Sequence, residues 1–204
     1  MKELVCRIAT DNDLDNIVRI HQASFEGFFL TTLGKSFLKQ YYKSVLKSAD
    51  GVLIIVQVEG TIIGFCAGTL LSAGYNMRLI KCDLFGFFCQ GIKLLFTHPL
   101  KLLHLFMNMT KKNAEMGDKG EYAEILSIGV DPNFQGGGVG KRMLTVLEKE
   151  VIVRGGNKLS LTTDFADNEK VVGFYHALGY NEWYDFVTYP NRRMYRMIKR
   201  LDNS

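Results

Sequence analysis

The sequence has little of what marks disulfide-stabilised, metal-binding or secreted proteins. Its four cysteines include no CxxC pair and its four histidines lack ligand spacing, so we expect no disulfide framework, no zinc site and no other metal. No signal peptide is expected, because Asp11, Asp13 and Asp15 follow closely on the first residues. Repeats, linkers and low-complexity segments are also lacking. We therefore expect one domain over residues 1–204, with reduced thiols and in the cytoplasm.

Charge of one sign is not in strong excess either. The net charge is +4, and 47% hydrophobic and 23% charged residues are ordinary for a soluble globular protein. No basic stripe alternates with aromatic residues, so nucleic acid is not an expected partner. Residues 72–120 carry seven Lys and Arg against three Asp and Glu, which favours an anionic partner instead.

What the sequence does contain is a glycine-rich turn, residues 135–140, between a predicted strand and a predicted helix. Strand formers fill residues 125–130, Pro132 ends that strand, and apolar residues recur at every fourth position from Val139 to Val151. Glycines let the backbone approach a ligand, and the first turn of a helix offers unpaired N–H donors. The turn is therefore a candidate phosphate or pyrophosphate site, and the alternative is a flexible loop.

Two general phosphate-binding motifs do not fit this turn. A Walker loop needs Ser or Thr where the chain has Arg142, and a dinucleotide fingerprint needs a small residue where the chain has Lys141. The turn instead resembles the Gln/Arg-x-x-Gly-x-Gly/Ala signature of the GNAT N-acetyltransferase superfamily, through Gln135, Gly138 and Gly140.

A second signature of this family follows at the expected separation. The family pattern is Asn, a helical turn, an aromatic–Tyr pair and then Leu-Gly-aromatic. The chain is similar to it at Asn168, at Phe174-Tyr175 and at residues 178–180. The resemblance covers most of the chain, with residues 72–121 as the exception.

The resemblance implies an α/β (α+β) fold. In this fold a mixed, mostly antiparallel central sheet of about seven strands is flanked by helices, and here residues 72–121 would form a helical insertion between the third and fourth strands. Acetyl-CoA is implied as the acetyl donor, with its pyrophosphate at the glycine-rich turn. Gly129 would permit the strand bulge and splaying of the family, and a small residue under close packing is the alternative. The cofactor-binding residues implied are Ile128, Gly129, Val130, Gln135, Gly136, Gly137, Gly138, Val139, Gly140, Lys141, Asn168 and Tyr175.

Two catalytic residues follow from the resemblance. Tyr175 stands where the family places the general acid for the departing thiolate, and phenol and thiol pKa values differ by only about two units. Glu124 lies eleven residues before Gln135, where a strand glutamate is the base in the histone-acetylating branch. An edge-strand charge facing water is the alternative. Water relays also stay open as bases, as do the side chains of Glu26, Glu121, Asp164 and His176.

Asn168 has two interpretations. By resemblance it binds the CoA arm, and as a residue type before 169–171 it suits a helix N-cap.

Periodicity and turn residues predict the remaining elements. Glu59-Gly60 indicates a tight hairpin, and residues 25–33 are expected to form an apolar loop. The predicted strands are 5–9, 52–58, 61–71, 158–163, 183–189 and 194–201, and the predicted helices follow residues 10–11 and span 35–47. By resemblance the apolar loop lines the acceptor pocket with Phe25, Glu26, Phe28 and Phe29, and the alternative is that its aromatics belong to the core.

The predicted insertion contains two strongly apolar stretches, 84–96 and 100–109. Lys93, His98, Pro99 and Lys101 interrupt them, so a membrane span is not expected. A helical lid on the acceptor side, a homodimer surface and a peripheral membrane contact through 84–109 stay open. We favour a helical insertion that packs on its own domain, partly over the acceptor site.

The resemblance implies an acetyl-CoA-dependent N-acetyltransferase. The acetyl group would move directly, in a ternary complex, to the primary amine of a small molecule such as an amino sugar, a polyamine or an amino acid. A protein or peptide N-acetyltransferase is the first alternative. A non-catalytic acyl-CoA-binding or membrane-associated module is the second.

Overall fold

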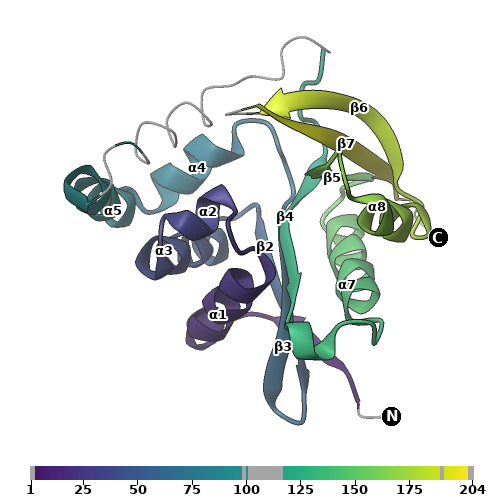
Figure 1. The fold of residues 1–204 in the computed structure, drawn as a ribbon, viewed down its shortest axis with the longest axis horizontal. Helices are drawn as coiled ribbons and strands as arrows, with labels where there is room; N and C mark the ends of the chain where they lie inside the picture. Colours follow the sequence, from purple (N-terminus) through teal and green to yellow (C-terminus); the bar gives the residue numbers. More distant parts are fainter. Residues whose placement is uncertain (1–2, 98–99, 101–116, 189–190, 202–204) are drawn as a thin grey trace.

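The centre of the molecule is a seven-stranded sheet in the order β1-β2-β3-β4-β5-β7-β6 (Figure 1). The computed structural model describes residues 3–97, 100, 117–188 and 191–201. Among the described strands only β4 and β5 pair in parallel, which confirms the predicted mixed, mostly antiparallel sheet. The strands are β1 Val5–Ile8, β2 Gly51–Val58, β3 Thr61–Thr69, β4 Ala123–Val130, β5 Lys158–Asp164, β6 Asn181–Thr188 and β7 Arg192–Arg200.

Helices cover both faces of this sheet, and each face has its own core (Figure 1). On one face α7 and α8 pack against the sheet through Met143, Leu147 and Tyr175. On the other, α1 and α3 pack through Ile17 and Leu38, because their apolar residues recur at helical spacing. The helices are α1 Leu14–Ser24, α2 Phe29–Thr32, α3 Lys35–Lys47, α4 Tyr75–Cys82, α5 Leu84–Thr97, α7 Val139–Val153 and α8 Glu169–His176, with 3-10 turns at Asp11–Asp13 and Pro132–Phe134.

Local turn chemistry accounts for two of the boundaries. The β2–β3 hairpin turns at Glu59 and Gly60, both with positive φ (49° and 79°), as the sequence predicts. The predicted apolar loop at 25–33 is only partly a loop, because the short helix α2 forms within it.

The segment between β3 and β4 contains α4 and α5, where the sequence predicts a helical insertion. Leu94 and Phe87 of α5 pack on Leu33 and Phe37, next to α3. The predicted apolar stretch 100–109 lies outside the described residues, except for Leu100. Within the described ranges, no helix has the length and apolar character needed to cross a membrane.

Candidate active site

Strands β4 and β5 pair over only three positions, from Ala123 to Ile125. β5 stays paired with β7 along its whole length, so the two parallel strands separate at their C-terminal halves. The second half of β4 therefore faces an opening. Its backbone N–H and C=O groups on that side have no β5 partner. An extended ligand arm can hydrogen-bond there as a further strand would.

A bulge at Leu126 marks the start of this opening. Ala67 pairs with Ser127 and Gly68 pairs with Ile125, which leaves Leu126 as the extra residue. As a result Ile125 and Ile128 both pack on the α7–α8 side, which an unbroken strand does not allow.

The prediction that Gly129 permits the bulge is wrong. Gly129 pairs regularly with Phe65. A Cβ on Gly129 would come within 2.8 Å of Phe65 Cε1 and 3.1 Å of Ser24 Oγ. Close packing under the end of α1 is therefore what requires glycine here.

The glycine-rich turn leads from the 3-10 turn into α7. Gly136 and Gly138 have φ of +84° and +72°, a region that favours glycine, and a Cβ on either would meet no other atom within 4 Å. No side chain caps α7, and Arg142 is the first of its residues whose N–H has an acceptor, Gly138 O, among the described residues. The N–H groups of residues 139–141 thus remain available to an anion in open space.

An ion pair between a buried carboxylate and a half-exposed guanidinium fixes the start of this turn. Asp131 accepts a hydrogen bond from the Asn133 N–H (3.1 Å) and pairs with Arg19 Nη1 at 2.7 Å. The hydrogen bond from Arg19 lowers the pKa of Asp131, so the carboxylate stays charged. α1 therefore holds the turn in place from across the sheet.

Tyr175 lies behind the glycine-rich turn. A Cβ on Gly140 would come within 3.3 Å of Phe174 Cζ, so the absence of a side chain there lets α8 approach α7. The Tyr175 ring contacts Phe174 and Tyr180, with centroids 5.2 and 5.7 Å away. Its hydroxyl has no hydrogen-bond partner among the described residues, and burial raises the pKa of Tyr175.

Asn168 occupies the N-cap position of α8, but its side chain does not cap the helix. Its amide nitrogen donates to Thr163 Oγ1 (2.7 Å) and to Asp164 O (2.9 Å), at the end of β5. The predicted helix-cap role is therefore wrong for the side chain. Asn168 instead holds the end of β5 against the start of α8, where β5 has left β4.

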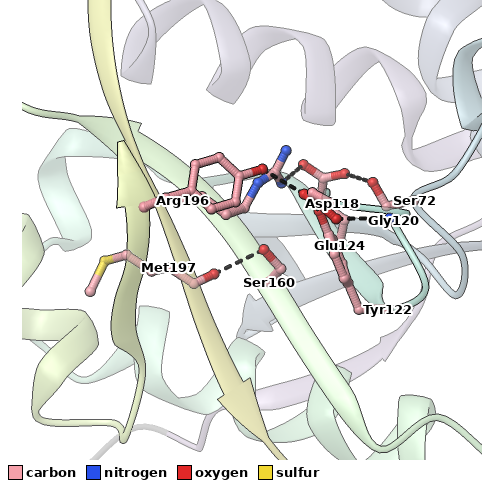
Figure 2. A network of polar contacts seen from close by, with 9 residues as sticks. Ser72, Asp118, Gly120, Tyr122, Glu124, Ser160, Arg196 and Met197 are labelled. Atoms are coloured by element: carbon pink, nitrogen blue, oxygen red, sulfur yellow. Dashed lines mark hydrogen bonds and ion pairs between the residues drawn. The ribbon is translucent and has the colours of Figure 1, made fainter. Parts of the chain in front are cut away.

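Glu124 lies within a buried polar network on the opposite face of the sheet, the α1–α5 face (Figure 2). One carboxylate oxygen accepts from Ser72 Oγ and the other from Arg196 Nη1. The side chains of Glu124 and Arg196 are 17% and 6% exposed. Because β4 lies inside the sheet, the alternative of an edge-strand charge facing water is wrong.

Arg196 is the other charge of this network. Burial lowers the pKa of Arg196, but the Glu124 carboxylate, together with the nearby Tyr122 and Tyr184, raises it overall, so the guanidinium is charged. Its Nε is buried without a partner among the described residues. Its Cζ lies 5.6 Å from the centre of the Tyr122 ring.

Asp118 ties the segment before β4 to the same network (Figure 2). Its carboxylate accepts from the hydroxyls of Tyr122 (2.6 Å) and Tyr184 (2.5 Å), and from the Gly120 N–H (2.8 Å). Ser72, Asp118, Glu124 and Arg196 therefore meet although they are up to 124 positions apart. Sequence inspection alone did not find Ser72, Asp118 or Arg196, because no local pattern marks them.

A second group of hydrogen-bonded polar side chains reaches β4 beside the bulge. The Tyr42 hydroxyl lies 2.9 Å from Ser127 Oγ and 2.6 Å from His21 Nδ1. His21 Nε2 is buried without a partner among the described residues. Burial lowers the pKa of His21 to about 4, so the imidazole is neutral. His21 and Tyr42 matched helical core positions and gave no other signal in the sequence.

The residues predicted for the acceptor pocket do not all lie together. Phe25 and Phe28 contact each other with ring centroids 5.4 Å apart, and Arg192 Cζ lies 4.4 Å from the Phe28 ring centre. Phe29 instead packs in the cluster under α5, which agrees with the core alternative, and Glu26 is exposed.

The other candidate bases are engaged or exposed. Asp164 pairs with Arg192, and His176 Nε2 lies 2.7 Å from Glu182 at the surface. Glu121 is exposed. No group of three or more His, Cys, Asp or Glu side chains in the described part of the chain could hold a metal ion.

The known proteins to which this chain is similar include acetyltransferases. The sequence model of the Acetyltransferase (GNAT) family matches residues 14–180. The mycothiol acetyltransferase of Kocuria rhizophila is 31% identical over 85 residues, which make up 42% of this chain but only 28% of that relative's length.

Two solved structures share the fold. The ribosomal-protein-S18-alanine N-acetyltransferase from Escherichia coli superposes with a TM-score of 0.63 at 15% identity, covering 99% of this chain and 96% of that one. The acetyltransferase yncA from Salmonella typhimurium, determined with its cofactor acetyl-CoA, gives a TM-score of 0.60 at 14% identity, covering 98% and 95%.

Proposed function

The chain belongs to the Acetyltransferase (GNAT) family, and from this premise we propose that it transfers the acetyl group of acetyl-CoA to the primary amine of a small molecule, directly in a ternary complex. Acetyl-CoA is the acetyl donor of this family and supplies an activated thioester when bound. The observation that carries the proposal is the glycine-rich turn, with its free N–H groups, next to the open half of β4.

The donor site is assigned to the main chain. Residues 136–141 would hold the pyrophosphate through backbone N–H groups, and Ile128 and Val130 would hydrogen-bond the pantetheine arm along the open edge of β4. This assignment is supported by the open space around Gly136 and Gly138, where a Cβ would meet nothing. Lys141 follows in the first turn of α7 and can add positive charge next to the phosphates.

Tyr175 is assigned as the general acid. Its hydroxyl has no partner in the part of the chain that the structure describes, and its pKa is raised, so it carries its proton throughout the neutral range. A raised pKa also makes the phenol a weaker donor than a free one. The proton therefore passes to the departing thiolate sulfur only if the hydroxyl and the sulfur are in direct contact, with no water between them.

Glu124 is assigned as the final proton acceptor, acting through Ser72. The Ser72 hydroxyl already donates to the Glu124 carboxylate, so a lone pair on its oxygen is free to accept a proton from the acceptor ammonium. As that proton reaches Ser72, the hydroxyl proton moves to Glu124, and the amine becomes a neutral nucleophile. Arg196 keeps the carboxylate in place during this transfer.

A small acceptor is favoured because Glu124 is recessed. Its side chain is 17% exposed and lies between Ser72 and Arg196, so the acceptor must be slender enough to bring its amine to the Ser72 hydroxyl. A cytoplasmic location remains our prediction, and it suits the four free cysteines of the chain.

The test is an acceptor screen that follows the release of CoA thiol. Polyamines, amino acids, amino sugars and short peptides would be offered with acetyl-CoA to the wild-type chain. We expect turnover with at least one small amine and slower turnover with peptides. Faster turnover with peptides would favour the protein acetyltransferase alternative. Tight binding of acetyl-CoA without turnover on any amine would instead support the non-catalytic module.

A further inference from the structure

The bulge in β4 determines on which face of the sheet Ser127 lies. Ser127 pairs with Ala67 of β3. Glu124, three positions earlier on β4, pairs with Thr69, which is only two positions further along β3. The extra residue therefore turns Ser127 to the same face as Glu124, and the rise along a strand separates the two by about 7 Å. Ser127 thus lies on the α1–α5 face, close to the Ser72–Glu124 pair and at the start of the open half of β4.

Ser127 is the outer end of a row of three hydrogen-bonded side chains. His21 of α1 and Tyr42 of α3 are 3% and 0% exposed, whereas Ser127 is partly exposed. Both helices pack on the α1–α5 face of the sheet (Figure 1). Within the described ranges, the Ser127 hydroxyl has no hydrogen-bond partner other than Tyr42. Ser127 is therefore the member of the row that an incoming molecule can contact.

The distances in this row indicate the direction of its hydrogen bonds. His21 Nδ1 and the Tyr42 hydroxyl oxygen are 2.6 Å apart, which is shorter than an N–H donor normally gives and usual for a hydroxyl donor. The phenol therefore donates to Nδ1, and the neutral imidazole carries its proton on Nε2. The Tyr42 oxygen is then left as an acceptor, and the Ser127 hydroxyl donates to it at 2.9 Å.

Two serines of this face therefore direct their protons inward. Ser72 donates to Glu124 and Ser127 donates to Tyr42, so each serine presents only oxygen lone pairs to an incoming molecule. Two such oxygens cannot donate to a carboxylate or a phosphate. They suit a group that carries several N–H donors, and a primary ammonium carries three.

We propose that Ser127 is a second binding residue for the amine of the acceptor, an inference that rests on the acetyl transfer proposed above. One N–H of the ammonium donates to Ser72 Oγ, and a second donates to Ser127 Oγ. The two contacts restrict the rotation of the amine, so the lone pair left when Ser72 takes its proton has a fixed direction. Ser127 keeps its own proton throughout. His21 and Tyr42 are positioning residues, because they hold the Ser127 hydroxyl in its direction.

Steady-state kinetics with the amine that gives the fastest turnover tests this role. Ser127→Ala should lower kcat/KM for that amine about 30-fold, chiefly through KM, because a hydrogen bond to the ammonium is lost. The matched control is Ser44→Ala, which removes a buried hydroxyl of α3 that donates to Gln40 O at 2.9 Å and should change neither constant. An unchanged KM in Ser127→Ala would overturn the proposal. So would a loss confined to kcat, because Ser127 would then not bind the amine.

A double-mutant cycle tests the positioning role of Tyr42. Tyr42→Phe should raise KM for the amine about fivefold, because the Ser127 proton can then turn outward, and the double variant should be no worse than Ser127→Ala alone. Additive losses would mean that Tyr42 acts on the fold and not through Ser127, and would overturn the assigned direction. Tyr75→Phe removes another buried hydroxyl from the same core and should keep the wild-type KM. The acetyl-CoA affinity of each variant should equal that of the wild type.

Nitrogen-15 NMR of His21 tests the proposal on the wild-type chain without turnover. We expect Nε2 to be protonated and Nδ1 not, with the His21 signals identified by their loss in His21→Gln. A proton on Nδ1 would reverse the row of hydrogen bonds, make Ser127 a donor and overturn the proposal. If the wild-type chain acetylates an amine, that result would refute the role of Ser127 and leave the proposed acetyl transfer standing. An absence of turnover with every amine would instead refute the acetyl transfer, and this proposal with it.

Discussion

The two faces of β4 present different kinds of chemical group. On the α7–α8 face, the donor face, the groups assigned to acetyl-CoA are mainly backbone N–H groups next to glycines, with Tyr175 behind them. On the α1–α5 face, the acceptor face, the groups are side chains, among them Ser72, Glu124 and Arg196, from segments far apart in the chain. A main-chain site suits a ligand common to a whole family. A side-chain site can change its specificity by single substitutions without disturbing the sheet.

Tyr175→Phe is expected to have the largest effect on the donor face. Loss of the general acid should lower kcat by about 1,000-fold and leave the KM for acetyl-CoA nearly unchanged. Steady-state kinetics of CoA release measures both. The control is Tyr180→Phe, which removes a hydroxyl that donates to Glu148 at 3.0 Å and should retain kcat. Equal losses of kcat in the two variants would mean that ring packing, not proton donation, matters at Tyr175.

Gly138→Val is expected to weaken acetyl-CoA binding by about 300-fold. A β-branched residue is strained at the φ of +72°, and its side chain enters the space assigned to the pyrophosphate. Titration calorimetry measures the affinity. Gly155→Val is the matched control, since Gly155 has φ of +83° with open space around it at the other end of α7. Weakening by both substitutions would show that backbone strain alone explains the loss.

Glu124→Gln should sharpen the comparison from the acceptor face. We expect kcat/KM for the amine to fall about 100-fold while acetyl-CoA affinity is retained. Glu148→Gln is a matched control. The Glu148 side chain is 16% exposed, against 17% for Glu124, and it pairs with Lys199 on the donor face.

Ser72→Ala separates the proton relay from the ion pair. It leaves the Glu124–Arg196 pair intact and should cost a similar factor in kcat/KM, with less loss of stability than Glu124→Gln, which leaves the buried Arg196 charge unpaired. Full activity of Ser72→Ala would remove Ser72 from the proposed path.

The smallest expected effect concerns His21, in the core of the acceptor face. The pKa of His21, about 4, lies below the value near 6.5 in the unfolded chain, so the unfolded chain takes up the proton first. The stability of the fold therefore decreases as the pH is lowered from 6.5 to 4. Between pH 7 and pH 5 this amounts to about 2 kcal/mol in the free energy of unfolding. Urea denaturation at several pH values measures the slope. His21→Gln should lose that part of it, while a slope unchanged in the variant would assign it to other groups.

The same division explains what could be predicted from the sequence. The helix at Lys35–Lys47 and the hairpin at Glu59-Gly60 follow from local periodicity and turn residues, and the structure agrees with both. The glycine-rich turn leaves a recognisable pattern because Gly136 and Gly138 adopt backbone angles that strongly favour glycine. The donor face is local in sequence, and so it leaves a pattern.

The acceptor face leaves no such pattern. Arg196 meets Glu124 across 72 positions and Ser72 meets it across 52, and only the pairing of the strands brings them together. The bulge was predicted at Gly129 but lies at Leu126, because the register with β3 sets its place and no turn residue marks it.

Hydrogen–deuterium exchange with and without acetyl-CoA tests the central claim most directly. If the donor is held by the main chain at the opening of β4, acetyl-CoA should slow exchange at residues 126–130 and 136–142 and leave α4 and α5 unchanged. Protection confined to α3 and α5, or no protection anywhere, would contradict the assignment of the donor site.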